Sequence, residues 1–315
     1  MTSDATGTSP VDDREERSGP TTGTGSGTGS GTGSGIEILR YSAFTHVPAG
    51  GNPAGVVLDA SALDAARMRA IAAEVGYSET AFVTGGDVES RRFGVRYFSP
   101  LAEVAFCGHA TVALAVALAE RLGPGEIVLD TPAGEIPVST TADGTGAVRA
   151  TLTSVPTRSR PALASGLDPA LRALGWTPAD LDPALPAHVA FGGNDHLVLA
   201  AASRARLADL DYDFDALDEV MRRHGWTTVD LVWRESAERF HARNPFPVGG
   251  VVEDPATGAA AAAFGGYLRE LGLVTGPGTI AIRQGEDMGR PSELLIDVSP
   301  LDPRTRVTGQ AVPIP

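Results

Sequence analysis

The chain has 315 residues, of which 42% are hydrophobic, so it can hold one large domain or two of ordinary size with a substantial core. Its 25 basic and 39 acidic residues give a formal charge of −14, which disfavours binding to nucleic acid and to anionic membrane surfaces. The single cysteine excludes an intramolecular disulfide and an all-cysteine zinc site. Since we find neither a secretory signal nor a long uncharged apolar run, we expect a cytoplasmic protein without a membrane span.

The first 35 residues are dominated by Thr, Gly and Ser and contain few apolar side chains. Such a segment cannot offset the entropy of ordering, so we predict a disordered tail over residues 1–35. Its glycines superficially match a dinucleotide-binding fingerprint. No strand pattern precedes them and no helix with a downstream acidic residue follows, so we expect no nucleotide site there.

The folded part is expected to start near Ile36, with alternating residues that predict strands at 36–41 and 54–58. A capping box at 61–64 predicts the start of a helix, and Gly76 is a plausible stop. Residues 81–83 are then expected to be extended. Two sets of apolar residues support these elements, namely one helix face at Met68, Ile71, Ala72 and Val75, and one strand face at Phe93, Val95 and Tyr97.

Two long apolar segments, 109–122 and 257–271, predict helices that are hydrophobic all round and therefore buried. Their endings are similar in sequence, and short strand patterns surround both. We therefore predict an α+β fold of two pseudo-symmetric halves, each with a barrel-like, mostly antiparallel sheet around a central buried helix. The Pro- and Ala-rich segment 154–182 is expected to hold the crossover between the halves, and 211–224 has helical spacing.

Glu79 is the first candidate for chemistry, because it lies between an apolar helix and an apolar strand and is flanked by two hydroxyl residues, Ser78 and Thr80. A glutamate after a helix end is often only a solvated charge. In this apolar context we favour a role in proton transfer, for which a partly buried carboxylate is suited.

Asp254 precedes a proline at the start of the second apolar helix. The pair is typical of a helix cap with proline in the first turn, and the same carboxylate can also contact a ligand, so both roles remain open. Gly108 and Gly258 mark the starts of the two apolar helices. Free N–H groups at helix N-termini bind anions or a developing enolate, although glycines there can also serve only helix packing. His109 can act as a proton relay or substrate donor, or be a simple cap or surface residue.

Cys107 stands at a helix N-terminus, where a thiol tends to have a lowered pKa and can act as a nucleophile or acid. The more common role of such a residue is that of a small buried filler, which we favour. A two-thiol racemase mechanism is impossible with one cysteine. The six histidines lack metal-ligand spacing, and we find no motif for a nucleotide or flavin, so we expect no metal and no cofactor.

The chain resembles the PhzF family, the phenazine-biosynthesis-like isomerases of the diaminopimelate epimerase fold, from Ile36 to the C-terminus. The resemblance rests on the order of five segments, namely 51–58, 78–83, 98–111, 253–258 and 284–292. It implies a homodimer and a site between the two halves. It also implies halves at 36–153 and 154–302, the first completed by a strand near 303–313.

The resemblance implies that Glu79 is the catalytic glutamate and that His109 and Asp254 contact the substrate and assist. Five further residues of the matched segments are expected to bind substrate: Asn52, Ser78, Gly108, Thr257 and Gly258. In related epimerases cysteines stand at both helix starts. Here Cys107 occupies the first position and Pro255 stands near the second, which fits single-carboxylate chemistry.

One departure is Ala259, where the phenazine enzyme has a serine that contacts substrate. The sequence therefore predicts a cofactor-independent isomerase that shifts a proton on a small carboxylate-bearing or conjugated substrate. The alternative is a non-catalytic small-molecule-binding or interaction protein that retains the fold.

Overall fold

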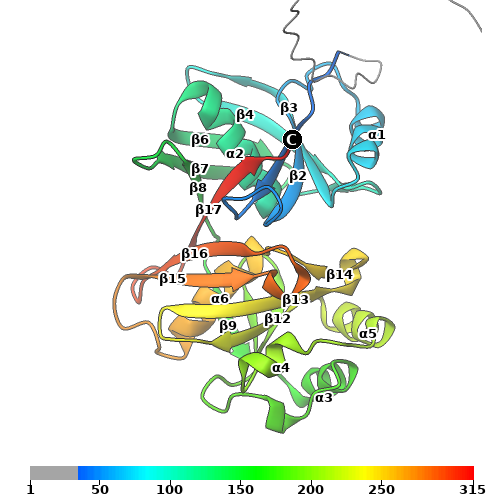
Figure 1. Cartoon of the computed structure of the whole chain (residues 1–315), viewed down its shortest axis with the longest axis vertical. Coiled ribbons are helices and arrows are strands. Elements are labelled where there is room, and N and C mark those ends of the chain that lie inside the picture. Colours follow the sequence, from blue (N-terminus) through cyan, green and yellow to red (C-terminus); the bar gives the residue numbers. More distant parts are fainter. Residues whose placement is uncertain (1–34) are drawn as a thin grey trace, which may run out of the picture. The chain divides into compact units, whose positions relative to one another are not determined.

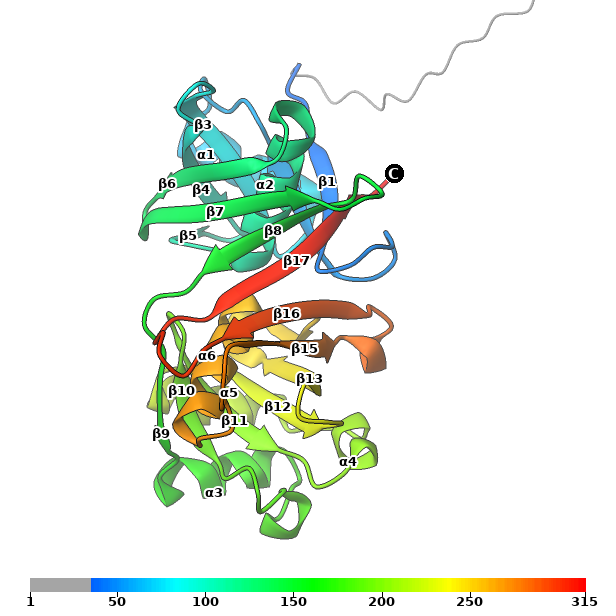
Figure 2. The ribbon, with the colours of Figure 1, turned by 90° about the vertical axis from the view of Figure 1, so that its left-hand side faces the viewer.

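The computed structural model describes residues 35–315, so the tail predicted at residues 1–35 lies, but for Gly35, outside the described residues. Residues 36–315 form one compact unit. Within it, two groups of strands each surround one helix (Figures 1 and 2). We call them the α2 half and the α6 half after these helices.

Eight strands of the α2 half pair in a closed ring, because β17 bonds to β8 on one side and to β1 on the other. Helix α2 (Gly108–Leu122) lies inside this ring, whereas α1 (Ala65–Val75) and the short β5 (Glu103–Val104) lie outside it. The ring consists of β1 (Leu39–Ala43), β2 (Asn52–Val57), β3 (Glu79–Asp87), β4 (Arg92–Phe98), β6 (Gly125–Thr131), β7 (Gly134–Ala142), β8 (Val148–Thr153) and β17 (Arg306–Pro313).

The α6 half repeats this arrangement around helix α6 (Gly258–Glu270). Its last strand, β16, continues into the first half by pairing with β17. The strands are β9 (Arg158–Pro161), β10 (His188–Phe191), β11 (Asp195–Ala200), β12 (Trp226–Arg234), β13 (Arg239–Phe246), β14 (Val251–Asp254), β15 (Gly278–Gln284) and β16 (Ser292–Val298). The other helical elements are α3 (Ala164–Ala173), α4 (Arg204–Ala208), α5 (Phe214–His224), and the 3₁₀ turns η1 (Pro178–Asp180), η2 (Pro247–Gly249) and η3 (Glu286–Met288).

The two halves match strand by strand. From β1 onward the successive pairings are antiparallel, parallel, antiparallel, parallel, antiparallel and antiparallel. From β10 onward the same order recurs. In each half the central helix joins the fourth strand of this series to the fifth. The predicted α+β fold with two pseudo-symmetric halves is therefore confirmed.

Helices α2 and α6 are buried because their sequences offer no polar face. Every residue from His109 to Ala119 is buried, and so is every residue from Ala260 to Leu268. Each fully buried Val or Leu contributes roughly 1.5–3 kcal/mol relative to exposure. Burial on all sides fixes the two helix axes, and thereby the positions of their N-termini.

Local predictions were mostly right and wrong in a few details. Helix α1 ends at Gly76 in a left-handed conformation, as predicted, but its N-cap is Asp64 and the predicted capping box is not formed. The segment 154–182, predicted to hold the crossover, connects β8 of the α2 half to the α6 half and contains β9, α3 and η1. Among the residues that the structure describes, no helix is long and apolar enough to cross a membrane.

Candidate active site

The two buried helices meet at their N-termini. A Cβ atom placed on Gly108 would lie 4.0 Å from the Cα atom of Gly258, so the helix starts are in close approach across the two halves. The first N–H groups of each helix have no partner within their own helix, and the positive ends of two helix dipoles converge here. The N-caps are Cys107 for α2 and Thr257 for α6, and neither caps with its side chain.

Asn52, the first residue of β2, connects the two halves at this point. Its amide nitrogen donates to Asp254 Oδ1 at 2.8 Å and to the Ala256 carbonyl at 3.1 Å, and it lies 3.2 Å from His109 Nδ1. The amide nitrogen has two hydrogens, and the two shorter contacts, to Asp254 and Ala256, use them.

Glu79 lies on the other side of this imidazole. The distance between Glu79 Oε2 and His109 Nε2 is 3.4 Å, and Ser78 Oγ is 3.3 Å from the same nitrogen. Cys107 Sγ lies 3.5 Å from Glu79 Oε2 and 3.4 Å from His109 Nδ1. Glu79 begins β3 and Cys107 precedes α2, so the fold brings together a carboxylate and a thiol that are 28 positions apart in the sequence.

Asp254 ends β14 and does not cap α6, so the capping role left open by the sequence is wrong. Its carboxylate accepts one hydrogen bond from the Thr257 hydroxyl at 2.6 Å and another from the Asn52 amide at 2.8 Å. Burial raises the pKa of Asp254, while the nearby His109 lowers it. The carboxylate is thus held by donors from both halves and points to the helix N-termini.

Gln284 was not predicted as a site residue, yet it fixes the segment that carries Asp254. Its amide nitrogen donates to the Asp254 carbonyl at 2.7 Å and to Thr257 Oγ1 at 3.0 Å, and its oxygen accepts the Thr257 N–H at 3.1 Å. Gln284 is 1% exposed. Its place in the matched segment 284–292 was the only sequence signal for this role.

Arg290 fixes the loop before Asn52 in the same way. Its guanidinium donates to the carbonyls of Gly50 and Gly51, both at 2.8 Å. Gly51 has φ +66°, and a Cβ there would lie 2.3 Å from the Ala43 carbonyl oxygen, so the tight loop requires glycine. Segments separated by more than 200 residues therefore meet in one polar assembly.

The predicted site residues differ in exposure. Asn52 and His109 are buried, as is the neighbouring Cys107, whereas the Glu79 side chain is 19% exposed and Ser78 is exposed. Four more residues are partly exposed: Gly108, Asp254, Thr257 and Gly258. The cluster thus has a buried floor and an accessible rim that includes Glu79, and the structure brings all eight predicted residues together.

The expected lowering of the Cys107 pKa is wrong. Burial raises the pKa of the thiol well above its usual range, and the charge of Glu79 adds to this effect. Desolvation of a fully buried group shifts its pKa by up to several units, and each unit corresponds to about 1.4 kcal/mol. A helix dipole contributes only roughly 0.3–1 kcal/mol, so desolvation dominates. Cys107 is therefore a neutral thiol in the free protein.

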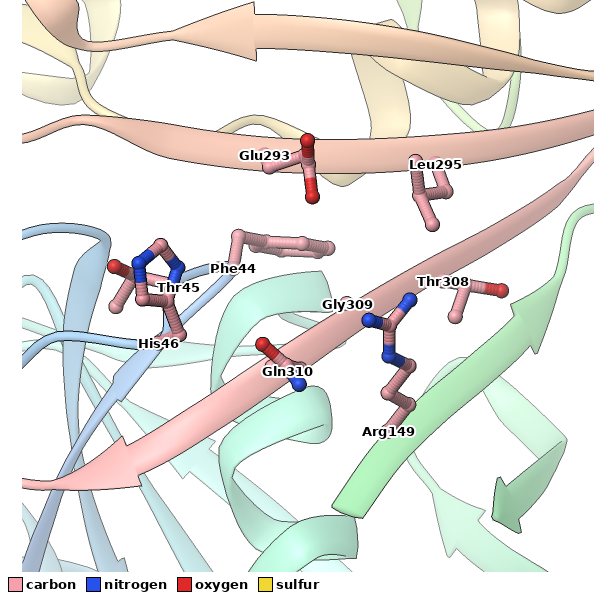
Figure 3. Close-up of a pocket in the computed structure, with 9 residues that line it drawn as sticks. All are labelled: Phe44, Thr45, His46, Arg149, Glu293, Leu295, Thr308, Gly309 and Gln310. Carbon is pink, nitrogen blue, oxygen red and sulfur yellow. The ribbon is translucent and has the colours of Figure 1, made fainter. Parts of the chain in front are cut away.

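A small pocket lies elsewhere, between β8, β16, β17 and the loop after β1 (Figure 3). Its volume of about 20 Å³ has room for roughly one water-sized sphere. Arg149 and Glu293 line it from different halves. None of the eight predicted site residues belongs to this pocket, so we do not assign the chemistry to it.

Two matched halves around central helices, with a carboxylate and an imidazole where the helices meet, define an α+β fold of the epimerase type. The sequence profile of the phenazine biosynthesis-like proteins (PhzC-PhzF) matches residues 41–315. The chain belongs to this family, and it is an isomerase.

Individual relatives agree with this assignment. The chain is 36% identical to an uncharacterized isomerase of Deinococcus radiodurans over 82% of its length and 85% of that protein. It is 32% identical to trans-2,3-dihydro-3-hydroxyanthranilate isomerase of Pseudomonas chlororaphis, over 79% of this chain and 86% of that one. The crystal structure of a PhzF-family phenazine biosynthesis protein of Bacillus anthracis is similar with a TM-score of 0.80 and 25% identity, covering 89% of this chain and 97% of that one.

Proposed function

We propose that this isomerase moves a proton between two carbon atoms of a small, carboxylate-bearing or conjugated substrate, without a cofactor, and that Glu79 is its general acid and base. The observation that carries the proposal is the position of Glu79 Oε2, 3.4 Å from His109 Nε2 on the accessible rim of a buried polar cluster. A base must reach both the substrate and the groups that orient it. Two observations support this role for Glu79: its side chain is 19% exposed, and it contacts His109.

In this mechanism a Glu79 oxygen takes a proton from a substrate carbon, and the electron pair of the broken C–H bond moves into the conjugated system. The carboxylic acid so formed gives the proton to a second carbon, which restores the carboxylate. The developing negative charge is stabilised by N–H groups at the N-termini of α2 and α6, near Gly108 and Gly258. No net charge or electron is gained or lost.

His109 and Asp254 assist without taking the proton from carbon. His109 Nε2 lies 3.4 Å from the Glu79 carboxylate and limits the orientations that this carboxylate can take. Asp254, bonded to Asn52 and Thr257, presents a carboxyl group to a polar substituent of the substrate. Ser78, Asn52 and Thr257 complete the expected substrate contacts.

The first compound to test is the substrate in the name of the Pseudomonas chlororaphis relative, trans-2,3-dihydro-3-hydroxyanthranilate, because it combines a carboxylate with a conjugated ring. Ala259 stands where the phenazine enzyme has a serine, so we expect weaker turnover of this compound than of the chain's own substrate. A panel of cyclic and acyclic amino and hydroxy acids extends the search. Incorporation of deuterium from D₂O into any of them reports proton transfer at carbon.

The deciding experiment compares Glu79→Gln with the wild type in this exchange assay. Glutamine keeps the shape of the side chain but cannot accept a proton from carbon, so exchange should fall by roughly 10²–10⁴-fold while the thermal midpoint stays within a few degrees. Glu126→Gln is the matched control, because Glu126 is an exposed glutamate of β6. Normal exchange by a folded Glu79→Gln variant would contradict the mechanism and direct attention to Asp254.

We also keep the homodimer implied by the family resemblance as a prediction. Light scattering of the purified protein tests it directly, with a mass near twice 32.4 kDa as the expected result.

A further inference from the structure

We propose that Glu79, Cys107 and His109 form a binding site for one zinc ion, and that zinc bound there blocks the residue that moves the proton. Each of these residues offers one ligand atom, and the three atoms lie within 4.8 Å of one another. This is the only such group of three that the described part of the chain contains. Sequence spacing could not reveal it, because Glu79 comes from a different element than the other two.

The distances between the ligand atoms fit tetrahedral zinc. With Zn–S near 2.3 Å and Zn–N or Zn–O near 2.0–2.1 Å, the edges of a tetrahedron are about 3.3–3.6 Å long. Cys107 Sγ is 3.5 Å from Glu79 Oε2, and the latter is 3.4 Å from His109 Nε2. With Nε2 as the ligand atom of His109, the third edge, from Sγ to Nε2, is 3.8 Å, a few tenths of an ångström longer than the ideal edge. An ion can therefore bind with little movement of the side chains.

The charges of the cluster also favour a dication. Glu79 contributes a carboxylate, and its ion-pair partner among the described residues is the imidazole of His109. A thiolate, a carboxylate and Zn²⁺ together are neutral, which removes the cost of a net charge in a partly buried place. On binding, the S–H bond of Cys107 breaks heterolytically, a Zn–S bond forms and the proton leaves to solvent, without oxidation or reduction. His109 binds through the lone pair of Nε2, with the hydrogen of the neutral imidazole on Nδ1.

Three protein ligands leave a fourth zinc position open, as in sites that bind water or a substrate atom. In this cluster, however, the metal takes the lone pair of the Glu79 oxygen that we propose as the base. Zinc should therefore inhibit the isomerase and compete with substrate. This consequence rests on the proposed function, whereas the binding of the metal does not.

The test uses Co²⁺ as a spectroscopic substitute for zinc in the full-length protein. A cobalt–thiolate bond gives a charge-transfer band in the near ultraviolet, and tetrahedral cobalt gives intense visible bands. Because the chain has a single cysteine, any thiolate band must come from Cys107. We expect one equivalent of Co²⁺ to produce both sets of bands and one equivalent of Zn²⁺ to abolish them. Absence of the thiolate band in the folded wild type would overturn the proposal whatever the variants do.

Variants then test the ligand set. Cys107→Ala should lose the thiolate band, and Glu79→Gln and His109→Gln should each weaken zinc binding by at least about 10-fold, since even an outer-shell change costs 10–100-fold. The matched control is His241→Gln. His241 also contacts carboxylates, those of Glu235 and Glu286, but the chain's single cysteine does not belong to this cluster. Loss of the bands in His241→Gln, or unchanged binding in Cys107→Ala, would refute the site.

The functional arm is separate. Zinc should inhibit deuterium exchange of the wild type, a chelator should reverse the effect, and Cys107→Ala should be inhibited at least about 10-fold less strongly. Cobalt bands without any measurable exchange activity would support the metal site and count against the proposed function. Exchange activity without cobalt bands would support the proposed function and overturn the metal site.

Discussion

Gln284 is the residue whose replacement most directly tests how the site is assembled. Its side chain is 1% exposed and makes three hydrogen bonds to the segment between Asp254 and α6. In Gln284→Ala the Thr257 N–H and the Asp254 carbonyl lose their partners in a partly buried place. Each unsatisfied buried group costs about 1–3 kcal/mol; because these two are partly exposed, we expect a loss of about 2–5 kcal/mol in the free energy of unfolding.

For a chain of this size, 1 kcal/mol corresponds to roughly 2 °C in the thermal midpoint, so Gln284→Ala should melt about 4–10 °C below the wild type. Since the segment positions Asp254 and the start of α6, deuterium exchange should fall as well. Calorimetry measures the first effect and the exchange assay the second.

The chain offers a matched control in Gln310, a partly exposed glutamine on β17. Gln310→Ala should change the free energy of unfolding by no more than about 0.5 kcal/mol, as is usual for a substitution away from such features. If both variants melt alike, the hydrogen bonds of Gln284 contribute little, and our explanation of how Asp254 is held is wrong.

Two further predictions concern stability. Burial raises the pKa of Asp230 to about 7, so the folded protein holds a proton that the unfolded chain releases, and stability falls by up to roughly 1.4 kcal/mol per unit as pH rises from about 4 to 7. Burial lowers the pKa of His196 to about 3, so between about pH 3 and 6.5 the unfolded chain binds a proton that the folded protein does not. This group therefore makes stability rise with pH over that range. Asp230→Asn removes only the effect of Asp230. The melting temperature of the variant minus that of the wild type should therefore increase from about pH 5 to pH 8, and a constant difference would contradict the raised pKa of Asp230. Separately, Gly51→Ala should lower the melting temperature more than Gly76→Ala, because both glycines have positive φ but only a Cβ at Gly51 would meet backbone, and calorimetry that finds equal losses would refute this.

The parts of the fold that the sequence predicted are those specified by local pattern. The two apolar segments predict buried helices because a helix without a polar face cannot lie on a surface. Glu79 and His109 were predicted as site residues because they stand in short ordered motifs. In each case the information lies within about 15 consecutive residues.

Other features depend on pairs far apart in the chain, and no local pattern encodes them. Asn52 contacts Asp254 across 202 positions, and Arg290 contacts Gly51 across 239. The pKa of Cys107 was expected to move in the wrong direction for the same reason. The helix start is visible in the sequence, but the burial and the neighbouring Glu79 carboxylate that dominate the pKa are produced only by the fold.

The pseudo-symmetry of the halves also carries a signal that sequence reasoning missed. Gly50-Gly51-Asn52 before β2 recurs as Gly192-Gly193-Asn194 before β11. Asn52 is buried with partners from the other half, whereas Asn194 is exposed. The repeated tripeptide thus serves the site in only one of its two copies.

The same comparison explains why we assign one base and not two. In the parallel pairing of β2 with β3, Glu79 stands opposite Ala54, and in the matching pairing of β11 with β12, Thr228 stands opposite His196. Thr228 is 1% exposed and its hydroxyl is bonded to Asn244. At the helix starts, Thr257 is the N-cap of α6 as Cys107 is the N-cap of α2. At these positions the α6 half offers hydroxyl groups where the α2 half offers a carboxylate and a thiol, and its own carboxylate in the cluster, Asp254, is already bonded to Asn52 and Thr257. A hydroxyl is too weak an acid and base to exchange a carbon-bound proton near neutral pH, so we expect the proton that Glu79 is proposed to remove to return from the same side of the substrate.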